Sequence, residues 1–193
     1  MKKIFTILAL VISASAFAGV TGSGVTMEYE GEYGQGKDSG TNGSSVAVAP
    51  YIKFGQGWKA DVKFDAGRDF GQTDGQNNAI DGKIEARIRK DFKVTDKLAA
   101  GLRLGVGEKF AGKDFSYYTV EPIVTYNLTQ PWSVNASVRY RNAFDTSNNF
   151  KTTTYKIGTA YKVTNQDEVG VKYFDKYGDS RSNGFELVYT RGF

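Results

Sequence analysis

The chain of 193 residues carries a formal net charge of +4 and contains neither cysteine nor histidine. The composition therefore excludes disulfides, thiolate–metal sites and every catalytic mechanism that needs an imidazole. The small net charge gives no support to nucleic-acid binding. A mean hydropathy of −0.42 is too low for a bundle of membrane-spanning helices.

The N-terminus has the layout of a secretory signal. Two lysines follow the first methionine, a short apolar run comes next, and Ala16 and Ala18 stand at the small-residue positions of a cleavage site. The apolar run is too short to cross a bilayer as a stable helix. We therefore expect residues 1–18 to be a cleaved signal peptide and residues 19–193 to form the exported domain.

Segments of alternating apolar and polar residues follow, each close to the roughly 9–11 residues that a tilted transmembrane strand needs. In one of them, Trp58 and Val62 alternate with Lys59 and Asp61, so that charges lie on one face only. The sequence predicts an all-β fold, a transmembrane antiparallel up-and-down β-barrel of about ten strands, with eight to twelve possible. The segments lie near residues 24–34, 44–55, 57–67, 79–93, 97–108, 116–127, 132–143, 152–163, 167–176 and 185–193.

Short and longer connections alternate along these segments. The short ones are 55–57, 94–97, 128–131 and 163–166, and the longer ones, rich in Gly, Asp, Asn and Ser, are 35–43, 68–79, 108–115, 143–152 and 175–183. Short periplasmic turns and longer outer loops are typical of bacterial outer-membrane barrels. Pro50 and Pro122 interrupt two segments, and we expect a bulge at each because proline cannot donate to a strand ladder.

The last segment carries aromatic and aliphatic residues on alternate positions and ends in an aromatic residue. It resembles the terminal strand of Gram-negative outer-membrane barrels, which the barrel-assembly machinery reads as a signal. The resemblance implies localisation in the outer membrane, with lipid, lipopolysaccharide and the assembly machinery as partners. The residues expected to form this assembly signal are Phe185, Leu187, Tyr189 and Phe193.

The charged faces, taken as pointing inward, predict the lining of a lumen. Arginines concentrate on one wall, glutamates on the opposite wall, and residues of both signs lie between them, which would set a field across the lumen. The alternative is that these groups meet as ion pairs and plug a narrow barrel. The residues predicted to line the path of a solute are Arg87, Arg89, Arg103, Arg139, Arg141, Lys59, Lys63, Lys83, Glu28, Glu30 and Glu186.

One stretch resembles the oligogalacturonate-specific porin family, which are small monomeric channels for acidic oligosaccharides. The matching residues run from Tyr118-Thr119-Val120-Glu121-Pro122 through Tyr126-Asn127-Leu128-Thr129 and Trp132-Ser133-Val134 to Ser137-Val138-Arg139-Tyr140-Arg141. The resemblance implies that arginines and lysines line the pore and guide an anionic sugar, Arg139 and Arg141 among them. That family has twelve strands, so ten strands would imply a narrower bore.

We therefore expect a porin for passive diffusion of small polar solutes, including anionic ones such as acidic oligosaccharides. The alternative is a non-conducting structural or adhesive barrel, with a lumen closed by ion pairs. A soluble secreted β-sandwich would leave the aromatic ending unexplained. We expect no enzymatic activity, no cofactor and no metal, and we favour a monomer.

Overall fold

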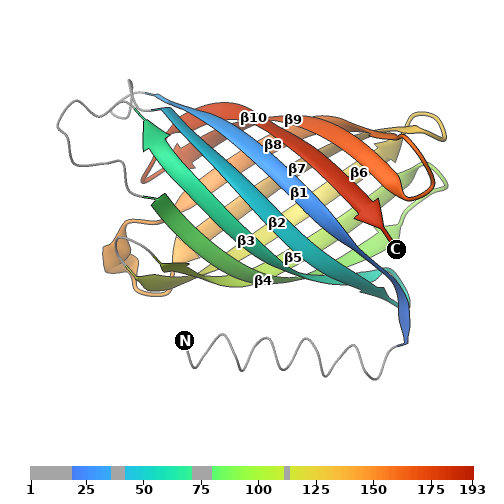
Figure 1. The fold of residues 1–193 in the computed structure, drawn as a ribbon, viewed down its shortest axis with the longest axis horizontal. Coiled ribbons are helices and arrows are strands. Elements are labelled where there is room, and N and C mark those ends of the chain that lie inside the picture. The colour runs from blue at the N-terminus through green and yellow to red at the C-terminus, as the bar shows by residue number, and fades with distance from the viewer. Residues whose placement is uncertain (1–18, 36–41, 71–79, 111–113) are drawn as a thin grey trace.

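The computed structural model describes residues 19–35, 42–70, 80–110 and 114–193. These residues form an antiparallel barrel in which each strand pairs with its neighbours in sequence, and β1 closes the barrel against β10 (Figure 1). The predicted fold class is confirmed, while the predicted signal peptide lies outside the described residues. The ten strands are β1 (Val20–Gly34), β2 (Asn42–Phe54), β3 (Trp58–Phe70), β4 (Ile80–Lys93), β5 (Leu98–Phe110), β6 (Phe115–Asn127), β7 (Trp132–Ala143), β8 (Thr152–Lys162), β9 (Asp167–Gly178) and β10 (Ser182–Gly192).

The two faces of the barrel differ in chemistry because successive side chains of a strand point to opposite faces. Apolar side chains are exposed on the outer face, where Ile157 is 58% and Tyr173 is 52% exposed. Charged side chains occupy the inner face, where Glu85 and Glu186 are each only 2% exposed. An apolar band toward lipid and a polar lumen are the arrangement of an outer-membrane barrel.

Three short turns at one end of the barrel repeat the same geometry. The backbone N–H groups of Val94, Leu128 and Val163 each donate to the carbonyl four residues later. In two of these turns the threonine that follows, Thr95 or Thr164, accepts backbone hydrogen bonds through its hydroxyl. Short turns lie at the periplasmic side of bacterial barrels, and we call this end the periplasmic end.

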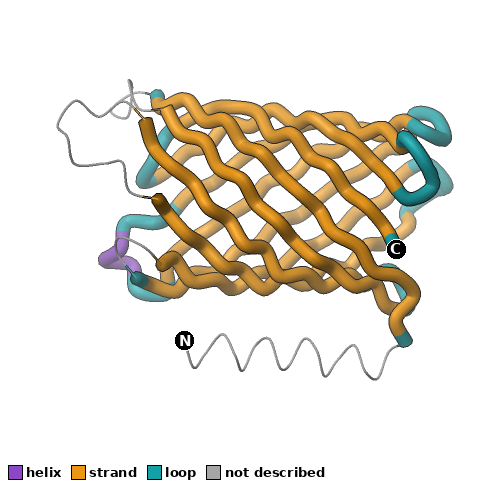
Figure 2. The backbone as a smooth tube through the Cα atoms, viewed as in Figure 1, coloured by secondary structure: helices purple, strands orange, loops and turns teal. Residues whose placement is uncertain are grey.

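The connections at the opposite, extracellular end are less uniform than the sequence predicts. The connection between β7 and β8 holds a 3-10 helix at Thr146–Asn148, at the end away from the C-terminus (Figure 2). Two predicted long loops are wrong: β9 and β10 continue through most of 175–183, and β5 and β6 take up much of 108–115. The described residues contain no helix that is long and apolar enough to cross a membrane.

The predicted bulges at the prolines are also wrong. Pro50 lies opposite Val25 in an unbroken register with β1, and the register with β3 is the same before and after it. Pro122 likewise lies opposite Leu102 without a shift. Both prolines are exposed on the outer face, so each removes a donor toward one neighbour and leaves the register intact.

Candidate functional site: the charged lumen

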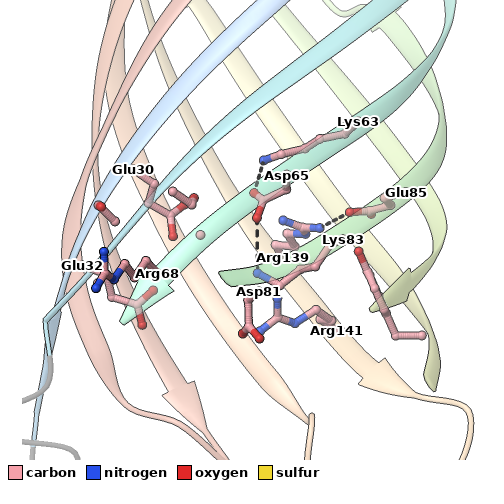
Figure 3. Close-up of a pocket in the computed structure, with 15 residues that line it drawn as sticks. Glu30, Glu32, Lys63, Asp65, Arg68, Asp81, Lys83, Glu85, Arg139 and Arg141 are labelled. Carbon is pink, nitrogen blue, oxygen red and sulfur yellow. Dashed lines mark hydrogen bonds and ion pairs between the residues drawn. The ribbon is translucent and has the colours of Figure 1, made fainter. Parts of the chain in front are cut away.

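Two cavities lie inside the barrel. The larger, about 510 Å³, lies at the periplasmic end, where residues of the turns such as Gln130 and Asn165 form part of its wall. The smaller, about 90 Å³, lies toward the extracellular end (Figure 3). Among the described residues, only Lys63 and Arg139 line both cavities. The lumen is therefore constricted where these two side chains lie.

The structure brings all the predicted lining residues to these cavities. Their role in the passage of a solute stays a prediction, but their position inside the barrel is as expected. The smaller cavity is lined by Glu30, Lys83 and Arg141. The larger is lined by Glu28, Lys59, Arg87, Arg89, Arg103 and Glu186, and the two residues shared by both are Lys63 and Arg139.

Ion pairs between the inner faces of different strands lie at the constriction and in the cavity walls beside it, and we call them the ion-pair belt. The guanidinium of Arg139 donates to Glu85 at 2.5 Å, and Arg87 donates to Asp61 at 2.5 Å. Because Asp61, Glu85 and Arg87 are at most 5% exposed, each of these charges depends on its partner for stability. The belt consists of Lys63 with Glu28, Arg87 with Asp61, Arg139 with Glu85, and both Lys156 and Lys172 with Glu186.

Small residues on the intervening strands allow the belt to form. Lys63 of β3 reaches Glu28 of β1 across β2, whose inward residues there are Ala47 and Ala49. Across β5, Glu85 also accepts a hydrogen bond from Thr119 at 2.5 Å. A Cβ atom at Gly105 of β5 would lie 2.3 Å from Glu85 Oε1.

The prediction of one basic and one acidic wall is wrong. Glu186, assigned to the acidic wall, lies 2.5 Å from the ammonium groups of both Lys156 and Lys172. Glu32 of β1 likewise pairs with Lys176. These three lysines lie on the inner faces of β8 and β9 and were not among the predicted lining residues. Their alternation with outward Tyr155, Ile157, Val171 and Tyr173 was the available signal.

Cations line up in one row of the periplasmic cavity. Lys53 lies directly opposite Lys59, Lys59 opposite Arg89, and Arg89 opposite Arg103. We call these four residues the cation row. Arg89 has Asp91 at 2.7 Å, and Arg103 has Glu121 at 3.0 Å.

The smaller cavity is balanced in charge. Asp65 lies between the ammonium groups of Lys83, at 3.3 Å, and Lys63, at 3.6 Å (Figure 3). The guanidinium of Arg141 stacks over the ring of Phe150, with 3.9 Å between its Cζ atom and the ring centroid. Phe150 belongs to the connection between β7 and β8, so this contact ties that loop to the inner wall of the barrel.

Three residues of the predicted assembly signal lie on the last strand, and Phe193 directly follows it. Phe185, Leu187 and Tyr189 alternate on β10 with inward residues, and Leu187 is 48% exposed on the outer face. The backbone N–H of Phe193 donates to the carbonyl of Ser23 at 2.9 Å. This bond extends the closing seam between β10 and β1. Recognition by the assembly machinery stays a prediction.

Comparison with known proteins identifies relatives of this barrel. The family described as oligogalacturonate-specific porin protein (KdgM) matches residues 13–190. The NanC porin structure shares 13% identity and a TM-score of 0.51, over 86% of this chain and 98% of that chain. An outer membrane channel from Pseudomonas putida shares 11% identity and a TM-score of 0.55, over 92% and 98% of the two chains. The structure of KdgM porin in complex with disordered oligogalacturonate shares 14% identity and a TM-score of 0.48, over 87% and 99%.

These findings differ in what they establish. No curated protein matches the chain, and at such low identities the solved structures with TM-scores above 0.5 support the fold alone. The family match reaches from before β1 into β10. Together with the apolar outer face and the charged lumen, it identifies an outer-membrane channel. The chain belongs to the oligogalacturonate-specific porin family.

Proposed function

We propose that this channel carries small acidic oligosaccharides across the outer membrane by passive diffusion. The main support for this proposal is the lining of the 510 Å³ cavity, in which lysines and arginines outnumber the carboxylates. An excess of one sign of charge on the wall of a cavity raises the local concentration of ions of the opposite sign. The description of the family, which names oligogalacturonate, agrees with such an anionic solute.

In this proposal the predicted lining residues form the path of the solute. The cation row, Lys53, Lys59, Arg89 and Arg103, lowers the barrier for an anion in the periplasmic cavity. At the belt, a carboxylate of the solute would replace Glu85 as the partner of Arg139, which lines both cavities. Exchange of one carboxylate for another keeps the guanidinium paired throughout the passage, while the displaced Glu85 retains its hydrogen bond from Thr119.

Single-channel recording across a salt gradient tests the proposal. The refolded barrel in a planar bilayer should give discrete current steps and a reversal potential of anion-selective sign. In liposome-swelling experiments, trigalacturonate should enter faster than maltotriose, a neutral sugar of similar size. Cation selectivity, or equal rates for the two sugars, would contradict the assignment of an acidic solute.

A second candidate is a barrel that does not conduct. The ion-pair belt favours it, because buried pairs such as Arg87 with Asp61 occupy space inside the barrel, and the lumen is constricted at Lys63 and Arg139. Absence of current from protein whose insertion is verified by protease protection would support this candidate. The extracellular connections would then be the working surface.

We further propose that the protein is a monomer without catalytic activity and that the assembly machinery reads its last strand. The alternation of Phe185, Leu187 and Tyr189 on the outer face of β10 supports the last point. Replacement of Phe193 by serine should lower the fraction of protein inserted in the outer membrane, as measured by cell fractionation. An unchanged fraction would remove Phe193 from the signal.

A further inference from the structure

The connection between β7 and β8, residues 144–151, places one aromatic ring on each side of the barrel wall. On the outer face, the ring of Phe144 packs against Tyr118, with 5.4 Å between the centroids. On the inner face, the ring of Phe150 packs against Phe115 and Tyr117, at 4.8 and 5.3 Å between centroids. The connection therefore straddles the extracellular rim of the barrel (Figure 2).

The inner ring covers a charged group of the lumen wall. The guanidinium of Arg141 lies over the ring of Phe150, and both Arg141 and Tyr117 line the extracellular cavity of about 90 Å³ (Figure 3). The Nε atom of Arg141 is buried and has no hydrogen-bond acceptor among the described residues. An aromatic ring attracts a cation through its face but does not replace such an acceptor. Phe150 thus occupies a place beside a lumen cation that a better partner could take.

The backbone of the connection is anchored at its two ends. The N–H of Phe144 donates to the carbonyl of Ser116 at 3.1 Å, and the N–H of Lys151 donates to the carboxylate of Asp179 at 2.7 Å. Between these anchors lies the 3-10 helix Thr146–Asn148, whose capping bonds come from within the connection itself. A segment held by local bonds can move as a unit while the strand ladders beside it stay intact.

The chain turns at the residue before the inner ring. Asn149 has a φ of 49° and a ψ of 55°, which is the left-handed region that often ends a helix. A residue other than glycine takes this conformation at a cost, so surrounding contacts must hold it there. At this point the contacts of the Phe150 ring do so. The backbone turn and the seating of the ring are therefore expected to form and break together.

From this arrangement we propose that the β7–β8 connection is a lid at the extracellular cavity and that Phe150 is its latch. While the ring is seated, it covers Arg141 and supports the cavity wall. When the ring leaves, the space that it occupied opens beside Arg141 and Tyr117, so the entrance widens. This inference goes beyond the proposed function, because it concerns access to the lumen from outside and holds for any solute.

The contacts of the latch suit a reversible device. Pairs of aromatic rings and a cation over a ring each contribute modestly to stability. The seated state should therefore be favoured, while the released state remains populated enough to be observed. Transitions between them should appear on the microsecond-to-second scale of lid movements.

Single-channel recording of two phenylalanine variants tests the latch. Phe150→Ala removes the inner ring, and the matched control Phe144→Ala removes a ring of the same connection from the outer face. We expect wild-type channels to alternate between two conductance levels. The ratio of time in the higher level to time in the lower should rise at least about fivefold in Phe150→Ala. Phe144→Ala should keep the wild-type ratio.

The current records can overturn the proposal in two ways. If Phe150→Ala gives the same conductance levels and dwell times as the wild type, Phe150 does not hold a lid. If the two variants change the dwell times equally, the inner seat has no special role. Asn149→Pro offers a second variant that keeps the ring, since proline cannot adopt the positive φ of this turn. It should shift the dwell times in the same direction as Phe150→Ala.

A silent barrel can be tested through the motion of the connection itself. A nitroxide on Ser147→Cys, at an exposed position in a chain without cysteine, reports this motion by electron paramagnetic resonance. The ratio of mobile to immobile label should rise at least about fivefold with Phe150→Ala and stay unchanged with Phe144→Ala. An unchanged ratio in Phe150→Ala overturns the latch. Silence of the wild type contradicts the proposed channel function alone, and label mobility then decides the latch.

Discussion

The inner faces of β3 and β4 carry two kinds of cross-strand pair. Toward the extracellular end, charges of opposite sign face each other; at the periplasmic end, Lys59 faces Arg89. The first kind lowers the energy of the folded barrel, and the second raises it. Departure from a local folding rule is expected at functional sites. The opposed pairs of unlike charge are Asp61 with Arg87, Lys63 with Glu85 and Asp65 with Lys83.

The difference between these two kinds of pair shows which charged groups in the lumen are available to a solute. In the belt, carboxylates such as Glu85 already hold the cations, and their side chains are buried. In the cation row, Lys53 and Lys59 contact an aromatic ring instead. The belt thus stabilises and narrows the barrel, while Lys53 and Lys59 of the row offer positive charge to the periplasmic cavity without a carboxylate within ion-pair distance among the described residues.

The sharpest test of the belt is to remove a carboxylate that holds two lysines. Glu186→Gln leaves Lys156 and Lys172 without their shared partner in a buried site. We expect a loss of about 3–5 kcal/mol in the free energy of unfolding, since a buried charge left unpaired is costly. Urea unfolding of the refolded barrel in phospholipid vesicles, followed by tryptophan fluorescence, measures it.

A matched control lies directly across the closing seam. Glu30 of β1 is opposite Glu186, and no lysine or arginine of the described chain forms an ion pair with it. Glu30→Gln removes the same charge without breaking a pair, and it relieves repulsion between two glutamates. Its stability should be unchanged or slightly higher. Equal losses in the two variants would mean that the belt does not depend on specific pairing.

A substitution at Gly105 tests whether the belt requires a residue without a side chain at this position. In Gly105→Ala, the new Cβ would lie 2.3 Å from Glu85 Oε1 and 2.4 Å from Thr119 Oγ1. We expect the variant to lose about 1–3 kcal/mol in the same unfolding assay, because these groups must shift. Gly22→Ala, where a Cβ meets nothing within 4 Å, should leave stability unchanged. A Gly105 variant as stable as the wild type would show that Glu85 moves without cost.

The sequence predicts the position of the charged residues but not their partners. Alternation of side chains along strands predicts the barrel, the strand number and the inward position of residues such as Arg87 and Arg103. It does not predict which inward charges pair, because Lys63 reaches Glu28 across an intervening strand only where Ala47 and Ala49 leave room. Such partners depend on register and on the size of neighbouring residues, which periodicity does not contain.

The cation row could also be predicted from the sequence, but only in part. Lys59, Arg89 and Arg103 were each placed on an inner face by alternation. The short turn at 94–97 sets the register that places Arg89 opposite Arg103, whereas Lys59 and Arg89 lie on β3 and β4, which no short turn joins. The overestimated loops at 108–115 and 175–183 show the limit of composition, since β5 extends to Phe110 and both Asp175 and Gly178 belong to β9.

The test with the smallest expected effect on stability introduces a carboxylate into the cation row, so that opposite charges face each other there as they do in the belt. Lys59→Glu places a carboxylate between Lys53 and Arg89, so that two repulsive pairs become attractive. We expect a gain of about 0.2–1 kcal/mol in the free energy of unfolding, typical of cross-strand ion pairs. Lys59→Gln, which removes repulsion without adding attraction, should give part of that gain.

The same substitution should cost the channel its preference for anions. The reversal potential across a salt gradient should move toward cations in Lys59→Glu and by a smaller amount in Lys59→Gln, because the first changes the local charge by two units. If the barrel becomes more stable while its ion selectivity shifts toward cations, the cation row lowers the free energy of unfolding and attracts anionic solutes. If Lys59→Glu lowers stability instead, the row is already compensated, and the contrast between the two halves of the lumen fails.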